Sequence, residues 1–302
     1  MTKIVITQNL GLNKAHIELL EKMGELTIYK DLAKTPEEWV ERCKNADVIC
    51  TGKFGLKQKY QELKNVFISL PFVGVGFFDK KILEKNNIKV SNSPGCNKDG
   101  VSEWIIFMMI NLFREFQEIV NVNDLKSRRP KITNSLAGKS ACILGKGNIG
   151  IKVGRVCEAL DMNVSYFTRG SNLIESIKDK DVIINCLTTN DTTLNLLDKE
   201  FFFSFKRGSF FVNVCDYAIY DVDALIKSLD EGIIEKAAID AMGIQVGDTS
   251  DSFYKKILAH EKILATPHIA WSTDVNDELG NKMMIENIEA WVNNKPINLI
   301  NP

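Results

Sequence analysis

Short apolar runs alternate along this chain with longer segments in which apolar positions recur every three or four residues. The short runs predict buried strands and the longer segments predict amphipathic helices. A first series of strands is expected at 3–7, 26–29, 47–50, 66–70 and 88–90, and a second at 141–144, 164–167, 182–186, 209–214, 236–240 and 262–265. This alternation is typical of an α/β protein with two doubly wound parallel sheets.

Two helical segments predict how the two series are joined. The stretch 101–120, which follows a helix N-cap expected at Asp99, is apolar on every side at 104–110. Such a helix should be buried at a domain junction or a subunit interface. A polar, basic connector is expected at 121–134. The last helix, expected at 277–293, is amphipathic and long enough to return to the first series.

Composition narrows the class of protein. With 302 residues, 45% hydrophobic and 25% charged, the chain is of ordinary globular type and long enough for about two domains. The net charge of -1 gives no reason to expect nucleic acid or an anionic membrane as a partner, and we interpret the basic cluster at 126–131 as a solvated loop. No apolar segment is long enough to span a membrane and no signal peptide is recognisable, so we expect a cytoplasmic protein.

Cysteines and histidines give no pattern of metal ligands. The seven cysteines include no Cys-x-x-Cys pair and stand mostly inside apolar runs, and only three histidines are present. We therefore expect buried thiols in a reducing compartment, with neither disulfides nor a metal site.

One glycine-rich segment carries a specific signal. The run Gly145-Lys146-Gly147-Asn148-Ile149-Gly150 follows a predicted strand directly and opens a helix expected at 149–160. In that context the first glycine allows a tight turn, the second lets the backbone approach a pyrophosphate, and the third permits close contact of helix and strand. The free N–H groups at the helix N-terminus would favour the phosphate charge. The segment predicts a dinucleotide site.

The end of the next strand predicts the choice of cofactor. An acidic residue there would hold the ribose 2′-OH of NAD, but this chain has Thr168 followed by Arg169. A neutral residue and a guanidinium remove repulsion toward a 2′-phosphate and offer it a bidentate donor. We therefore expect NADP to be preferred, with NAD possible.

Six segments together resemble a known family: Val73-Gly74-Val75-Gly76, Asn92-Ser93-Pro94-Gly95, 144–150, 208–213, Ala237-Ala238-Ile239-Asp240 and Thr266-Pro267-His268-Ile269-Ala270-Trp271. Their order and spacing are similar to those of the D-isomer-specific 2-hydroxyacid dehydrogenases. The ending and an early Gly52-Lys53 look most like the glycerate dehydrogenase/hydroxypyruvate reductase branch, which is similar to phosphoglycerate dehydrogenase.

The resemblance implies an activity and an architecture. It implies an oxidoreductase that transfers hydride between NAD(P)H and a small 2-oxo or 2-hydroxy acid such as glyoxylate or hydroxypyruvate. It also implies a flavodoxin-like substrate domain at 1–95, to which 273–302 return, and a Rossmann cofactor domain at 96–272. A homodimer held by the apolar crossover helix is the usual assembly of the family.

The resemblance also implies roles for single residues. Asn148 and Ile149 would touch the pyrophosphate, Thr168 and Arg169 the adenosine ribose, Leu187 and Val214 the nicotinamide, and Asp240 its carboxamide. Val75 and Gly76 would contact the substrate. His268 would be the general acid/base that gives a proton to the keto oxygen as hydride arrives.

Two positions depart from the family pattern. The substrate-clamping Arg is replaced by Asp216, whose carboxylate would repel a 2-oxo acid by roughly 4 kcal/mol at 4 Å in an effective dielectric near 20. The Glu that supports the catalytic histidine is replaced by Gln245, a neutral amide that can orient the ring but cannot favour imidazolium by charge. The loop after Gly76 is also about two residues shorter and carries Phe77-Phe78.

Three interpretations follow from these departures. In the first, an active dehydrogenase grips its substrate anion with other cations, for which Lys53 and Lys98 are candidates. In the second, the substrate is uncharged or cationic, and Asp216 binds it or pairs with His268. In the third, the chain is a catalytically inactive nucleotide-binding regulator. The retained His268 favours activity, whereas the loss of both its family partners favours the third interpretation.

Overall fold

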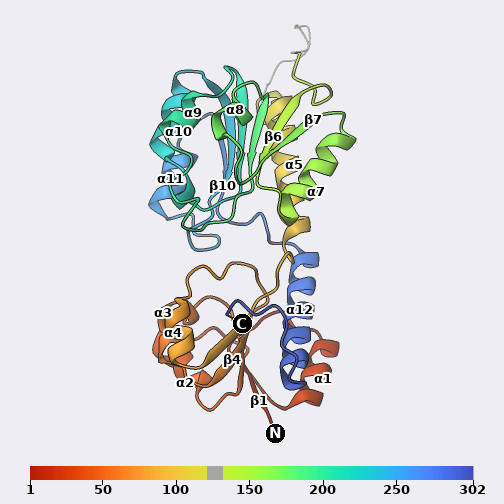
Figure 1. Cartoon of the computed structure of the whole chain (residues 1–302), viewed down its shortest axis with the longest axis vertical. Helices are drawn as coiled ribbons and strands as arrows, with labels where there is room; N and C mark the ends of the chain where they lie inside the picture. Colours follow the sequence, from red (N-terminus) through yellow and green to blue (C-terminus); the bar gives the residue numbers. More distant parts are fainter. Residues whose placement is uncertain (121–131, 302) are drawn as a thin grey trace. The chain divides into compact units, whose positions relative to one another are not determined.

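The computed structural model describes residues 1–120 and 132–301 and divides into two compact units (Figure 1). Unit 1 comprises Met1–Asn97 and Thr273–Pro302, and unit 2 comprises Lys98–Ser272. The basic cluster at 126–131 and most of the connector expected at 121–134 lie outside the described residues.

Unit 1 is built on a five-stranded parallel sheet in the order β2-β1-β3-β4-β5. Its strands are β1 (Lys3–Ile6), β2 (Glu25–Ile28), β3 (Val48–Cys50), β4 (Val66–Ser69) and β5 (Ile88–Ser91). Its helices are α1 (Lys14–Met23), α2 (Pro36–Cys43), α3 (Leu56–Lys59), η1 (Tyr60–Glu62), α4 (Lys80–Lys85) and α12 (Asp274–Val292). The order is that of a flavodoxin-like doubly wound sheet, which confirms the predicted fold class.

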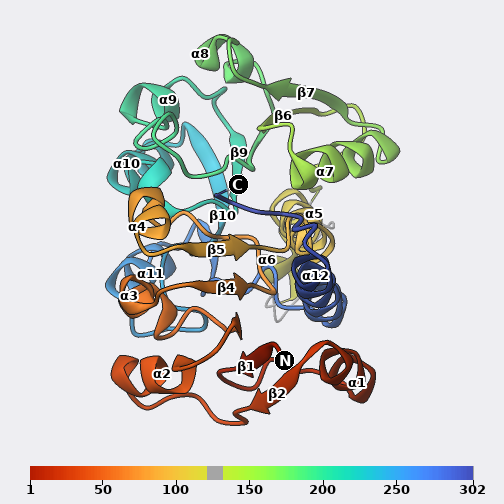
Figure 2. The same cartoon turned by 60° about the horizontal axis from the view of Figure 1, so that its bottom comes forward.

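Alternate residues of these strands enter two separate hydrophobic clusters, because successive side chains of a strand point to opposite faces. One cluster packs the sheet against α2, α3 and α4, and the other packs it against α1 and α12. Figures 1 and 2 show these two groups of helices on opposite sides of the sheet. The C-terminal helix is fixed there by Trp291, whose ring stacks on Phe67 with centroids 4.4 Å apart.

Unit 2 is built on a six-stranded parallel sheet in the order β11-β10-β9-β8-β6-β7. Its strands are β6 (Ser140–Leu144), β7 (Asn163–Phe167), β8 (Val182–Asn185), β9 (Ser209–Asn213), β10 (Ile234–Asp240) and β11 (Ile263–Thr266). Its helices are α5 (Lys98–Arg114), α6 (Phe116–Val120), α7 (Asn148–Ala159), α8 (Leu173–Ile177), α9 (Lys199–Phe203), η2 (Tyr217–Ile219), α10 (Val222–Asp230) and α11 (Ser252–Leu258). All eleven predicted strands are therefore present.

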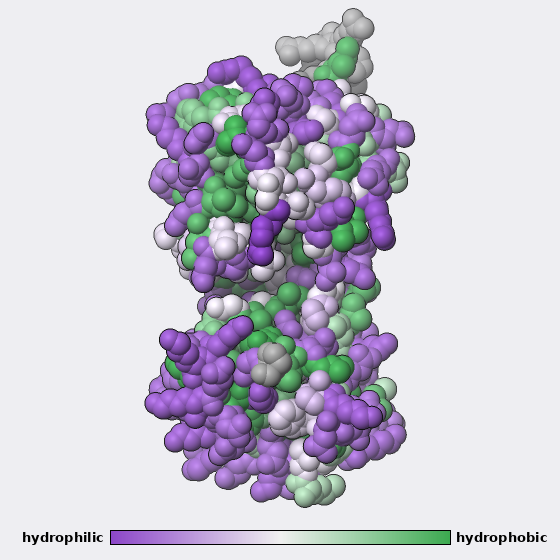
Figure 3. Space-filling model, in the orientation of Figure 1, coloured by the Kyte–Doolittle hydropathy of each residue, from purple (hydrophilic) through white to green (hydrophobic). Residues whose placement is uncertain are grey.

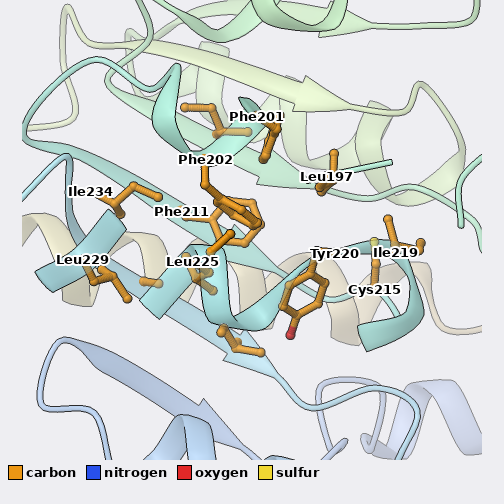
Figure 4. Close-up of a cluster of buried hydrophobic side chains, with 14 of the residues drawn as sticks. Leu197, Phe201, Phe202, Phe211, Cys215, Ile219, Tyr220, Leu225, Leu229 and Ile234 are labelled. Carbon is orange, nitrogen blue, oxygen red and sulfur yellow. The ribbon is translucent and has the colours of Figure 1, made fainter. Parts of the chain in front are cut away.

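The core of unit 2 likewise has two sides. Helices α5 and α7 cover one face of the sheet, and α9, α10 and α11 pack on the other. On the second face Phe201 and Phe202 of α9 meet Phe211 of β9, all three fully buried (Figure 4). Outside the core, Figure 3 shows mostly hydrophilic side chains on the visible surface of each unit. Among the described residues, no helix has the length and apolar character that crossing a membrane requires.

The crossover helix differs from its prediction. The stretch expected as one helix at 101–120 is divided at Glu115, which has the left-handed φ of +46°, so α5 ends at Arg114 and α6 follows. The expected N-cap, Asp99, instead lies in the first turn of α5, where its carboxylate forms an ion pair of 2.5 Å with Lys152 of α7. The last helix begins at Asp274, three residues earlier than expected, because Thr273 caps it.

Candidate functional site

Three neighbouring strands of unit 2 end in buried polar residues. Asn185, Asn213 and Asp240 are the last residues of β8, β9 and β10, with exposed fractions of 0%, 0% and 2%. Because the strands are parallel, these side chains share the carboxyl edge of the sheet, which is where open α/β sheets bind their ligands. The glycine turn follows β6 at the same edge, at the point where the strand order reverses.

The two asparagines tie adjacent strand ends together. Asn185 Nδ2 donates to Asn213 Oδ1 (2.8 Å), and Asn213 Nδ2 donates to the Cys215 carbonyl (3.0 Å). Asn185 Oδ1 accepts the N–H of Leu187 (3.2 Å). These bonds fix the segments that carry Leu187 and Val214, the residues expected near the nicotinamide. Sequence reasoning missed Asn185; an amide at the end of an otherwise apolar strand was its only signal.

The glycine turn has the geometry that a pyrophosphate requires. Gly145 adopts a φ of +98°, and a Cβ on Gly150 would lie 2.2 Å from the Gly145 carbonyl oxygen. By contrast, a Cβ on Gly147 would meet open space, and Gly147 caps α7 without any side-chain hydrogen bond. The N–H groups at the start of α7, at Asn148 and Ile149, therefore have no side-chain cap. The residues present fit a dinucleotide phosphate.

The strand that would end beside the adenosine ribose carries no acid at its tip. Thr168 and Arg169 follow β7 directly, are both exposed, and lead into a turn at Gly170, whose φ is +93°. Thr168 Oγ1 lies 3.5 Å from Ser171 Oγ.

Asp240 holds the segment that contains the candidate acid/base. Its Oδ1 accepts the Thr266 hydroxyl (2.6 Å) and the Ile269 N–H (2.9 Å), and its Oδ2 accepts the Ala270 N–H (3.0 Å). Both carboxylate oxygens are thus engaged by the chain itself. Beyond its expected contact with a carboxamide, Asp240 therefore anchors the turn on both sides of His268.

His268 is buried within this turn in a constrained conformation. Its exposed fraction is 8%, and its φ is +59°, which is rare for a residue other than glycine. Its Nδ1 lies 3.0 Å from the Ile244 carbonyl oxygen. Gln245, which we expected to orient the ring, is exposed. The partner of Nδ1 is thus the main-chain carbonyl one residue before Gln245, and no sequence motif signals that contact.

Asp216 lies next to the loop that contacts His268. It is half-buried and caps η2, with Oδ1 accepting the Ala218 N–H (2.9 Å). A Cβ added to Gly243 would lie 3.1 Å from Asp216 Oδ1 and 2.5 Å from the Tyr217 ring, and Gly243 has a φ of +110°. The Asp216 carboxylate therefore lies beside the 240–245 loop.

The candidate substrate residues lie in both units. In unit 1, Lys53 Nζ is 5.4 Å from the Phe72 ring centroid and 3.8 Å from the position of a Cβ on Gly74. Val75 is half-buried and Gly76 exposed in that same loop. Lys98 is exposed at the start of α5 and belongs to unit 2, so the two candidate lysines are not neighbours within one unit.

The cysteines are free thiols, six buried and Cys186 half-buried. Burial raises the pKa of the Cys186 thiol to about 12. A Cβ on Gly145 would lie 3.1 Å from the Cys186 carbonyl oxygen, so this residue borders the glycine turn. Within residues 1–120 and 132–301, no group of three or more His, Cys, Asp or Glu side chains is arranged to hold a metal ion.

Comparison with known proteins agrees with this geometry. Residues 105–270 match the model of the D-isomer specific 2-hydroxyacid dehydrogenase, NAD binding domain. A D-lactate dehydrogenase of Staphylococcus aureus is 25% identical over 278 residues, which cover 83% of this chain and 84% of that protein. Unit 2 is thus a nicotinamide-dinucleotide-binding domain. The chain belongs to the D-isomer specific 2-hydroxyacid dehydrogenases, a family of NAD-dependent enzymes that act on the CH–OH group of 2-hydroxy acids.

Two solved structures share the fold over the full length. An acyclic imino acid reductase in complex with NADPH and D-Arg superimposes with a TM-score of 0.86 at 21% identity, covering 99% of this chain and 100% of that one. A glyoxylate reductase from Paecilomyes thermophila superimposes with a TM-score of 0.83 at 19% identity, covering 99% of this chain and 98% of that one.

Proposed function

We propose that this protein is a reductase that transfers hydride from NADPH to a small 2-oxo acid such as glyoxylate or hydroxypyruvate. The observation that carries the proposal is the setting of His268. A buried imidazole is held in a left-handed turn by the three hydrogen bonds to Asp240 and by the Ile244 carbonyl. Strained backbone is retained where the surrounding structure enforces it, and such places cluster at functional sites.

Different residues of unit 2 bind the cofactor and donate the proton in the proposed reaction. The bound nicotinamide supplies the hydride. Asn148 and Ile149 at the start of α7 hold the pyrophosphate, while Leu187 and Val214 border the nicotinamide and exclude water. Asp240 binds the carboxamide as well as anchoring the His268 turn. With Nδ1–H donating to Ile244, Nε2 is the atom from which His268 gives a proton to the substrate oxygen.

We assign to Lys53 the role of the missing arginine, which is to attract the substrate anion. Its Nζ lies 3.8 Å from the position of a Cβ on Gly74 and 5.4 Å from the Phe72 ring centroid, so the ammonium is beside the 74–76 loop. Val75 and Gly76 supply main-chain contacts beside it. A lysine provides a point charge without the bidentate geometry of arginine, so we expect weaker orientation of the carboxylate.

A second candidate substrate is favoured by Asp216. A carboxylate in the position of the family arginine suits a protonated imine or another cationic group, and the imino acid reductase that shares the fold binds D-Arg and NADPH. In this alternative, His268 and the cofactor residues keep their roles, and Asp216 binds the substrate nitrogen.

One assay separates these functions. The full chain is supplied with NADPH and glyoxylate, hydroxypyruvate or pyruvate, each with and without ammonium, and the products are identified by mass. Hydroxy acids formed without ammonium support the first proposal, and amino acids formed only with ammonium support the second. Measurable NADPH binding with no product from any substrate contradicts both and indicates an inactive nucleotide-binding regulator.

The cofactor, assembly and location belong to the same proposal. Arg169 and the absence of an acid after β7 favour NADPH over NADH.

Phe107 and Ile110 leave 61% and 39% of their surface exposed on α5, which supports a homodimer across this helix. A fall from dimer to monomer mass in Phe107→Glu tests that assembly. The seven free thiols suit a reducing cytoplasm.

A further inference from the structure

Lys146, the second residue of the glycine turn, is exposed and extends toward the neighbouring edge strand. Its Nζ lies 5.0 Å from the centroid of the Tyr166 ring in β7. An ammonium over an aromatic ring is attracted by the negative face of that ring. This contact directs the Lys146 side chain toward β7.

The Tyr166 ring is itself fixed in place. A Cβ added to Gly154 of α7 would lie 1.9 Å from the Tyr166 hydroxyl, so the ring lies directly against the helix where only glycine leaves room. The turn is also tied to the strand, because the Gly145 N–H donates to the Phe167 carbonyl (3.0 Å). Lys146 is therefore held close to the end of β7 by two independent contacts.

The charged residues near the end of β7 have a net positive charge. Arg155 and Glu158 of α7 both act electrostatically on Tyr166, and their charges oppose each other. Arg169 follows β7 by two residues, and neither it nor Lys146 forms an ion pair with another residue in the part of the chain that the structure describes. Two exposed cations thus belong to the segments at this strand end, where a dinucleotide places its adenosine ribose.

We propose that Lys146 and Arg169 together bind the 2′-phosphate of NADP(H), and that Lys146 is a second determinant of cofactor specificity. The inference rests on the proposed dinucleotide site and extends it to a residue that the glycine fingerprint leaves unassigned. Arg169 offers the phosphate a planar pair of donors, and Lys146 adds a compact charge.

Adenosine fragments test this assignment without any turnover. The affinities of the full chain for adenosine 2′,5′-bisphosphate and for AMP are measured by calorimetry in Lys146→Met and Arg169→Met. Methionine keeps the apolar stem over Tyr166 and removes the charge. Lys199→Met is the matched control, because Lys199 is also exposed, with its Nζ 5.6 Å from the Phe203 ring, but stands at the start of α9.

We expect Lys146→Met to weaken binding of the bisphosphate about tenfold and of AMP less than twofold, with the control unchanged. An unchanged bisphosphate affinity, or an equal loss for both ligands, overturns the assignment of Lys146. If wild-type protein gains no affinity from the 2′-phosphate, both this assignment and the NADP preference fail while the dinucleotide site stands. If neither ligand nor NADPH binds, the proposed function fails as well.

Discussion

The Nδ1 atom of His268 lies 3.0 Å from the carbonyl oxygen of Ile244. A main-chain carbonyl in this position fixes the tautomer and the orientation of the ring without adding a charge. The chain therefore supplies by backbone geometry the orientation that its family obtains from a glutamate. This carbonyl holds the ring without the family glutamate, but it supplies no charge that would favour imidazolium.

Gln245 is expected to be dispensable for the proton transfer. Its side chain is exposed, and the ring is held by the preceding carbonyl, so Gln245→Ala should change kcat less than threefold. His268→Gln, which keeps a polar side chain but has no imidazole, should lower kcat at least a thousandfold with the Kd for NADPH unchanged. Steady-state rates and fluorescence titration of NADPH measure both. A large loss in Gln245→Ala would show that the amide, and not the carbonyl, orients the ring.

Asp240→Asn should loosen the turn that carries His268. An amide replaces one acceptor oxygen with an NH2 group, which cannot accept the N–H or O–H groups that bond to the carboxylate. Each hydrogen bond to a charged group is worth about 1.5–3 kcal/mol. We expect kcat to fall at least tenfold, together with a lower melting temperature. Thr266→Val removes one of the three hydrogen bonds and should give a smaller loss. If Asp240→Asn raises the Kd for NADPH and leaves kcat intact, Asp240 acts only as a cofactor ligand.

Asp216→Asn distinguishes the two substrate classes. Asparagine still caps η2, so the fold should be retained. Removal of the negative charge should lower KM for glyoxylate at least tenfold, because repulsion of a carboxylate is worth up to roughly 4 kcal/mol. For a cationic imine the same substitution should raise KM instead. An unchanged KM for every substrate would place Asp216 away from the bound substrate.

The protein should lose stability in alkaline solution through its buried thiols. Burial raises the pKa of Cys50 and of Cys157 from the ordinary value of 9.0 to about 12, and both side chains are fully buried. The stability that each contributes is present below pH 9 and is lost as pH rises toward 12, because above pH 9 the unfolded chain ionises and the folded one does not. The free energy of unfolding should fall by about 1.4 kcal/mol per pH unit for each thiol.

Urea unfolding at pH 8.5 to 10.5 measures this slope. Cys157→Ser is less stable at every pH but should show a shallower slope, because serine does not ionise in this range. Equal slopes for the two proteins would mean that Cys157 does not contribute to the alkaline loss.

The two sheets could be predicted from the sequence, but the main-chain contact that holds the His268 ring could not. The eleven strands follow from apolar runs, and the glycine turn follows from Gly145, Gly147 and Gly150 in the right context. The carbonyl of Ile244 could not be predicted, because any residue can supply a main-chain oxygen. The break at Glu115 was equally hidden, since a left-handed residue other than glycine has no clear signature.

The most direct test of the central claim follows the transferred hydrogen. The full chain is incubated with NADPH deuterated at C4 and with glyoxylate or hydroxypyruvate, and the products of the wild-type protein and of His268→Ala are analysed by mass spectrometry. The account predicts deuterium on C2 of a 2-hydroxy acid from the wild-type protein and none from His268→Ala, although both bind NADPH equally. Product formed at the wild-type rate by His268→Ala, or no deuterated product from the NADPH-bound wild-type protein, would contradict it.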